Sequence, residues 1–192
     1  MGAVLPVLEG TRFPKSLRTV PEVPVAGDGP NKGLYVLKSA KTNRKLGKGD
    51  HLITKGPWRG MILYSLTLPE RSTCWDGCQQ WDNCYGNHVP FGHRFEPGPE
   101  LEQALSRDMA FLSRKHPEGF VVRLHILGDF YSVDYVRHWR TLLEQHPEAH
   151  VFGYTHWPPD TEIGEALTDW VASNRRVSLR RSDGDSQTDP LP

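Results

Sequence analysis

Strand and helix patterns alternate from residue 61 to residue 180, and this alternation limits the possible folds more than any other feature of the chain. Short apolar, β-prone runs at 61–68, 121–127, 150–155 and 176–180 are expected to form strands. Apolar residues at helical spacing lie between them. This order predicts a parallel sheet with right-handed crossovers. We therefore expect an α/β protein with an open parallel sheet of about four β/α units.

The expected helices carry apolar side chains at intervals of three and four residues. The first follows Pro97 and Pro99, Ser132 is the expected N-cap of the second, and the third contains Trp170. Trp139 in the second helix and Trp170 in the third fall at core positions, and we interpret both as packing residues.

The chain has 192 residues and is 37% hydrophobic, enough for one domain with a core. Residues 1–50 are rich in Pro, Gly and basic residues, and we expect them to form a flexible basic N-terminal arm in which 31–50 are ordered by docking on the domain. Residues 51–183 would form the β/α domain, which would also carry the metal site described below. Residues 184–192 are polar and are expected to be a disordered tail.

The charge is balanced overall but unevenly distributed. Residues 1–55 hold ten Lys and Arg against four Asp and Glu, so the arm could contact nucleic acid, although a solvated tail is the more ordinary role. No apolar run reaches membrane-spanning length, so no membrane partner is expected. Three cysteines cannot all pair as disulfides, and free thiols fit a cytoplasmic protein.

The three cysteines of the chain lie within eleven residues, as Cys74-x3-Cys78-x5-Cys84. The segment is rich in turn-forming residues and lacks apolar periodicity, which favours a loop over a core element. Three thiolates are one short of a closed metal site, so another residue supplies the last bond or one position stays open.

One interpretation is a [4Fe–4S] cluster whose fourth iron is open. S-adenosylmethionine could bind that iron, and the protein would then be an enzyme that needs an electron donor and acts on an unidentified substrate. A second interpretation is zinc, because Cys84-x3-His88 completes a Cys3His set, and His93 is another candidate ligand. Aromatic residues such as Trp75 and Tyr85 could then stack on single-stranded nucleic acid. A third is a non-catalytic cluster capped by a histidine.

The loops after the expected strands bring further polar residues to the same sheet edge as the cysteines. They contain Gly128 and Asp129 after the second strand, Thr155 after the third, and Arg180 and Ser182 after the fourth. Asp129 could bind a ligand or bond the turn backbone.

Two residues of the second strand have polar side chains. Arg123 faces away from the apolar side and could meet a carboxylate ligand, although a salt bridge is more ordinary. His125 is interpreted as a hydrogen-bonded packing residue.

Four segments together resemble the phage gene product 88 family, which also occurs in bacterial and plasmid-borne proteins. They are KLGKG (45–49), MILYSLTLPERSTCWDGCQQWDNCYGN (61–87), RLHILGDFYSVDYVRHW (123–139) and FGYTH (152–156). The resemblance covers roughly residues 42–183. It implies a divergent relative of radical S-adenosylmethionine enzymes, with a partial (β/α) barrel and an iron–sulfur cluster on Cys74, Cys78 and Cys84.

The same resemblance implies a binding site for S-adenosylmethionine. Gly128 and Asp129 take the place of the turn that contacts the methionyl amino group. Thr155 and Arg180 or Ser182 would lie near the ribose and carboxylate. The chain departs from the usual Cys-x3-Cys-x2-Cys spacing of radical enzymes in its last interval, and it offers fewer β/α units than their six.

Overall fold

The structure is a computed structural model that describes residues 17–42, 52–88, 93–182 and 188–190. The expectations for 1–16, for 43–50 and for 184–187 and 191–192 of the tail lie outside these described residues. The strands are β1 (Leu17–Arg18), β2 (Lys38–Ser39), β3 (Ile62–Ser65), β4 (Arg94–Phe95), β5 (Phe120–Leu124), β6 (Ala149–Thr155), β7 (Val177–Ser182) and β8 (Thr188–Pro190). The helices are α1 (Pro99–Lys115), α2 (Val133–Gln145) and α3 (Glu162–Ser173), with short 3-10 helices η2 (Ala40–Thr42) and η3 (Tyr85–His88).

The main sheet has the strand order β2-β3-β5-β6-β7-β8. Strands β3, β5, β6 and β7 are parallel and adjacent, which confirms the expected parallel core of four strands. The edge strands β2 and β8 are antiparallel to their neighbours, so the sheet as a whole is mixed. The sheet formed by these described strands is open, without closure into a barrel.

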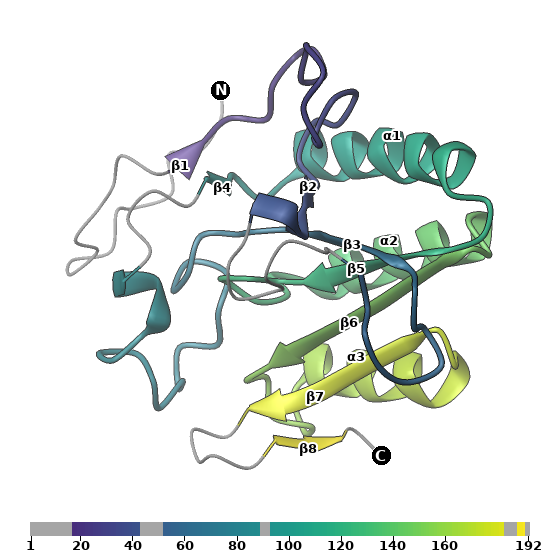
Figure 1. The fold of residues 1–192 in the computed structure, drawn as a ribbon. Coiled ribbons are helices and arrows are strands. Elements are labelled where there is room, and N and C mark those ends of the chain that lie inside the picture. The colour runs from purple at the N-terminus through teal and green to yellow at the C-terminus, as the bar shows by residue number, and fades with distance from the viewer. Residues whose placement is uncertain (1–16, 43–51, 89–92, 183–187, 191–192) are drawn as a thin grey trace.

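The three helices lie on one face of this sheet (Figure 1). Alternate strand residues such as Tyr64, Val122 and Val151 pack with them in the main hydrophobic core. The opposite face, which we call the open face, carries a smaller apolar cluster around Leu63 and Val121. Side-chain caps begin two of the helices: Ser132 accepts a hydrogen bond from the backbone of the first turn of α2, as expected, and Thr161 does the same for α3.

The residues interpreted as packing residues are buried. Trp139 and Trp170 are at most 1% exposed, which confirms their place in the core. The Nε2 atom of His125 lies 3.2 Å from the Tyr135 hydroxyl oxygen, and the His125 ring packs edge-on against Phe130. These contacts confirm a hydrogen-bonded packing role.

Part of the expected arm docks on the domain. Leu34, Val36 and Leu37 are buried in the main core, and β2 follows them at the sheet edge. The buried carboxylate of Asp108 in α1 accepts hydrogen bonds from the backbone N–H groups of Tyr35, Val36 and Leu37 at 2.7–2.8 Å. This single side chain replaces the ladder partners that the segment lacks. Among the described residues, no helix is long and apolar enough to cross a membrane.

Candidate functional site

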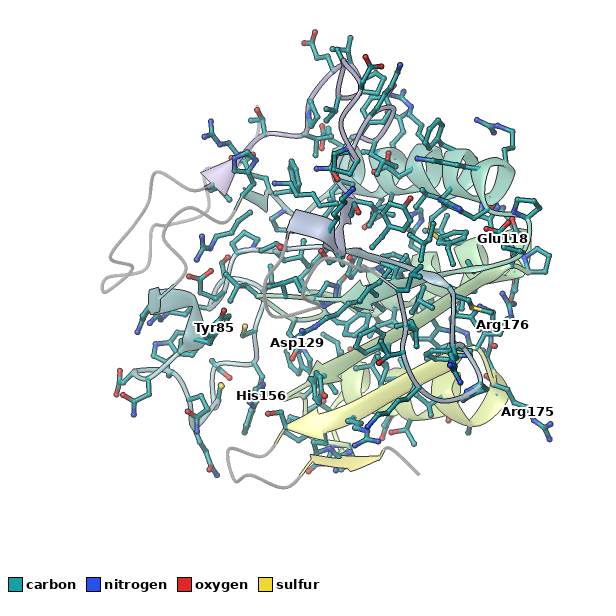
Figure 2. The ribbon with its side chains drawn as sticks, viewed as in Figure 1. Tyr85, Glu118, Asp129, His156, Arg175 and Arg176 are labelled. Atoms are coloured by element: carbon teal, nitrogen blue, oxygen red, sulfur yellow. The ribbon has the colours of Figure 1, made fainter. Side chains whose placement is uncertain are left out.

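The carboxyl ends of the four parallel strands bring together the segments that the sequence marks as chemically interesting. The segment 69–88, which we call the cysteine loop, follows β3. Figure 2 shows Tyr85, Asp129 and His156 together at this edge, whereas Glu118, Arg175 and Arg176 lie at the opposite end of the strands. Parallel strands place their following loops side by side, so the topology alone creates this gathering.

The cysteine loop is a succession of tight backbone turns. The N–H of Cys74 donates to Arg71 O at 3.2 Å, and that of Cys78 to Trp75 O at 3.2 Å. The N–H groups of Trp81 and Asn87 donate to the carbonyls of Cys78 and Cys84, respectively. Each cysteine therefore sits in a turn that the local backbone fixes, as the turn-rich composition predicts.

Two buried arginines hold this loop in place through hydrogen bonds and an ion pair. Arg71 has a positive φ of 69°, and its guanidinium donates to Trp81 O at 3.1 Å and to Asn87 Oδ1 at 2.8 Å. Arg94 in β4 forms an ion pair with Glu70 and donates to Gly86 O at 3.2 Å. Both side chains of that pair are at most 9% exposed. The loop is thus tied at its start and near its end.

The three thiols are free and half-buried. Burial, with smaller contributions from the Asp129 carboxylate, Cys84 and Cys78, raises the pKa of Cys74 to about 12, against a backbone hydrogen bond that lowers it. Burial also raises the pKa of Cys78, with Cys84 and Asp129 adding to the effect. Cys74 therefore lies close enough to Asp129, Cys78 and Cys84 to interact with them electrostatically, and Cys78 does so with Cys84 and Asp129.

The donor set suits a metal or cluster, but the thiols are not drawn together around one point. Within the described ranges, no three His, Cys, Asp or Glu side chains converge closely enough to hold an ion. Three partly buried thiolates are destabilised by their mutual repulsion and by the loss of hydration. A bound cationic centre would offset both effects. Of the candidate fourth ligands, the His88 side chain lies outside the described part, and His93 is exposed beside Lys38 and Arg18.

Asp129 is the hub that joins the strand ends. Its carboxylate is 2% exposed and accepts hydrogen bonds from Phe130 N at 2.8 Å, Thr155 Oγ1 at 3.2 Å and His156 N at 2.8 Å. Burial raises the pKa of Asp129 to about 7, against these three hydrogen bonds, which lower it. These contacts are those of the turn-bonding role, so this side chain connects the loop after β5 to the end of β6.

The same turn also holds the cysteine loop. The Asp129 N–H donates to Thr73 Oγ1 at 3.1 Å, and the Thr73 hydroxyl donates to Pro69 O at 2.7 Å. Gly128 has a φ of +78°, and a Cβ added there would lie 2.6 Å from Thr73 Oγ1 and 2.7 Å from Leu68 Cβ. A side chain at this position would push the turn away from the loop.

The remaining expected site residues occupy different positions around this hub. Thr155 is buried, donates to Asp129 and accepts from Trp157 N at 3.1 Å. Arg180 is exposed on β7 in register with Tyr154, and Ser182 is half-buried at the end of the same strand. Gly128, Asp129 and Thr155 thus form one contact set with the cysteine loop, whereas Arg180 and Ser182 lie on the strand beyond it.

Sequence reasoning missed the residues that position the loop. Glu70, Arg71, Thr73 and Arg94 carry no metal-ligand or catalytic spacing, and the Glu70–Arg94 pair spans 24 residues. One local signal existed: Arg71 and Thr73 lie within three residues of Cys74, where a buried turn needs internal hydrogen-bond partners.

Comparison with known proteins identifies one relationship. A family model described as Gene product 88 matches residues 36–170, which is more than half of the chain. No curated protein and no solved structure matches.

Proposed function

This chain belongs to the Gene product 88 family, and from the geometry of its cysteine loop we propose that Cys74, Cys78 and Cys84 hold an iron–sulfur cluster. One observation carries the proposal: a single loop brings three free, electrostatically interacting thiols to the carboxyl edge of four parallel strands. A [4Fe–4S] cluster held by three cysteines keeps one iron open.

We further propose that S-adenosylmethionine binds beside that open iron. When bound, such a cluster supplies an electron to the sulfonium of the cofactor, and radical chemistry follows. The four sequential parallel strands with helices on one face support this proposal, because they have the arrangement of a segment of (β/α) barrel wall. In this proposal the sheet is a partial barrel with the cofactor at its carboxyl edge.

The chain's own residues divide the work in this proposal. Gly128 permits close approach of the backbone, and Asp129 positions the turn and the end of β6 through its three accepted hydrogen bonds. Thr155 fixes Asp129, so its effect on a ligand is indirect. Arg180, which is exposed on the neighbouring strand, would meet the methionyl carboxylate, with Ser182 next to it.

The test is reconstitution with iron and sulfide in the absence of oxygen, followed by reduction and addition of S-adenosylmethionine. We expect visible iron–sulfur absorption, a change in the electron spin resonance signal on addition of the cofactor, and 5′-deoxyadenosine as a product. Arg180→Gln should weaken cofactor binding in calorimetry, whereas Arg137→Gln, on the exposed side of α2, should leave it unchanged. A cluster whose signal does not respond, with no binding heat, would remove the cofactor from the proposal. Zinc without sulfide would favour a Cys3His site instead.

A further inference from the structure

The open face of the sheet is divided into an apolar half and a polar half. Towards the amino end of the strands, Trp58 and Met61 pack with Val121 and with Phe152, which is in register with Arg123, and the rings of Trp58 and His150 lie 5.2 Å apart between centroids. The segment before β3 therefore covers part of this face.

Arg123 is the central polar residue of the polar half of this face. It alternates with Val121 along β5, so it shares the open face, and its neighbours Val122 and Leu124 are in the helix-side core. Its guanidinium carbon lies 5.9 Å from the centroid of the Tyr154 ring. Burial lowers the pKa of Arg123, and the adjacent Tyr154 and Tyr85 oppose this effect. Tyr85 follows Cys84 directly, so the cysteine loop borders Arg123.

Among the described residues Arg123 has no acceptor, in contrast to Arg94 and Arg176. On β7, the Nε of Arg181 is also buried without a partner. Arg94 pairs with Glu70, and Arg176 donates to three backbone carbonyls at its strand entrance. For Arg123, no ion pair forms with any described residue, and its buried Nε has no hydrogen-bond partner. Partial desolvation of a guanidinium without an acceptor is unfavourable, and a bound anion would supply the missing partner.

We propose that Arg123, together with Tyr85 and Tyr154, binds an oxyanion, a carboxylate or phosphate group of a small ligand that lies on the open face. The guanidinium offers a planar fork of donors that matches either group. The two tyrosines offer aromatic surface to the rest of the ligand, since both are about 40% exposed despite their position beside a half-buried cation. The site needs no metal, so it stands or fails separately from the cluster.

The test is a titration of metal-free protein with inorganic phosphate and, separately, with acetate, at constant ionic strength set by sodium chloride. The Arg123 Nε–H resonance reports contact directly, and calorimetry reports affinity. We expect saturable binding of at least one anion and a shift of that resonance. Arg123→Gln should weaken binding about tenfold or more, because one charge-assisted bidentate contact is lost. Arg123→Lys should lie between the two, and Arg137→Gln should bind like the parent protein.

The two anion arms distinguish a phosphate-bearing from a carboxylate-bearing ligand. Equal affinity in the parent protein and in Arg123→Gln would overturn the proposal. Binding of phosphate or acetate that an equal concentration of chloride abolishes would overturn it as well. If Arg123→Gln does not fold, the parent protein decides alone. A phosphate- or acetate-induced shift of the Arg123 resonance that chloride does not cause supports the site, and no shift with either anion refutes it.

Discussion

At the scale of single residues, the candidate site rests on side chains that bond to the protein itself. Asp129 could have been a ligand for a cofactor amine, but its carboxylate accepts three hydrogen bonds from the chain and is buried. Because buried acceptors with several donors are difficult to replace, Asp129 acts first on the geometry of the strand ends. Any ligand contact at this edge is then set by groups that Asp129 positions.

Asp129→Asn should lower the free energy of unfolding by about 1–3 kcal/mol. The asparagine amide would face at least one N–H donor, so one of the three accepted hydrogen bonds becomes a repulsion. Denaturant unfolding of the metal-free protein measures the effect. Asp28→Asn is the control, because Asp28 is exposed and its ion pair among the described residues is with Lys32, and the stability of this variant should equal that of the parent. Equal stability of both variants would contradict the hub role of Asp129.

His125 should make the protein less stable as the pH falls below about 6.5. Burial lowers its pKa to about 3, from the 6.5 of an exposed histidine. The unfolded chain therefore takes up a proton between these two values that the folded chain refuses, and stability falls by at most about 1.4 kcal/mol per pH unit. The contribution is fully present above pH 6.5.

The pH effect is measured by comparing unfolding free energies at pH 7 and pH 5. His125→Gln cannot titrate in this range, so its pH slope should be shallower than that of the parent. Tyr135→Phe removes the hydrogen bond to His125 but keeps the ring, and it should keep the steep slope. The other histidines are common to all three proteins and cancel in the comparison. An unchanged slope in His125→Gln would refute the assignment.

At the scale of elements, the cysteine loop is positioned by contacts from two other segments and by one contact within itself. The turn after β5 reaches it through Thr73, β4 reaches it through Arg94, and its own first turn reaches its last through Arg71. A loop whose only regular element is the short helix η3 thereby acquires a fixed path, which a site that binds a metal with three side chains requires.

Gly128→Ala should destabilise the protein more than Gly27→Ala. Both glycines have a positive φ, of 78° and 85°, so both substitutions carry a similar backbone penalty of about 1–2 kcal/mol. A Cβ at Gly128 would in addition overlap Thr73 and Leu68, whereas nothing lies within 4 Å of one at Gly27. We expect a difference of about 1–3 kcal/mol in unfolding free energy. Equal losses of unfolding free energy in the two variants would show that the turn at Gly128 is not packed closely against the cysteine loop.

Arg94→Gln should destabilise the protein by about 3 kcal/mol or more, because it leaves the Glu70 carboxylate buried without its partner. The cysteine loop should also become a preferred site of limited proteolysis, since Gly86 O loses its donor. Arg137→Gln on α2, whose ion pair is exposed, serves as the control and should change neither property. Normal stability together with a protected loop in Arg94→Gln would contradict the bracing role.

At the scale of the whole molecule, the periodic part of the chain was predictable and the parts held by distant partners were not. The apolar runs and helical spacing placed β3, β5, β6 and β7 in the right order and direction, because both patterns are local. The edge strand β2 has two residues, and it pairs with Ser65 and Tyr64, far along the chain, so no local pattern announces it. β8 lies in the polar segment expected to be disordered.

The candidate site also has a part that the sequence indicates and a part that it does not. The cysteines and the strand-end turn residues stand out as candidates because of their residue types and spacing. Asp108, which holds a segment more than 70 residues away, and Arg94, which pairs across 24, could not be found without coordinates. A lone charged residue in the sequence has no sign of burial, and its partner is defined only by the fold.

The iron and acid-labile sulfide content of protein purified without oxygen tests most directly whether the cysteine loop holds a cluster. For the parent chain we predict about four of each per chain. Each of Cys74→Ala, Cys78→Ala and Cys84→Ala should lose most of both, while circular dichroism confirms that the β/α fold remains. Full retention of iron and sulfide in all three variants, or a folded parent that takes up neither under reconstitution, would contradict the claim that this loop is a cluster site.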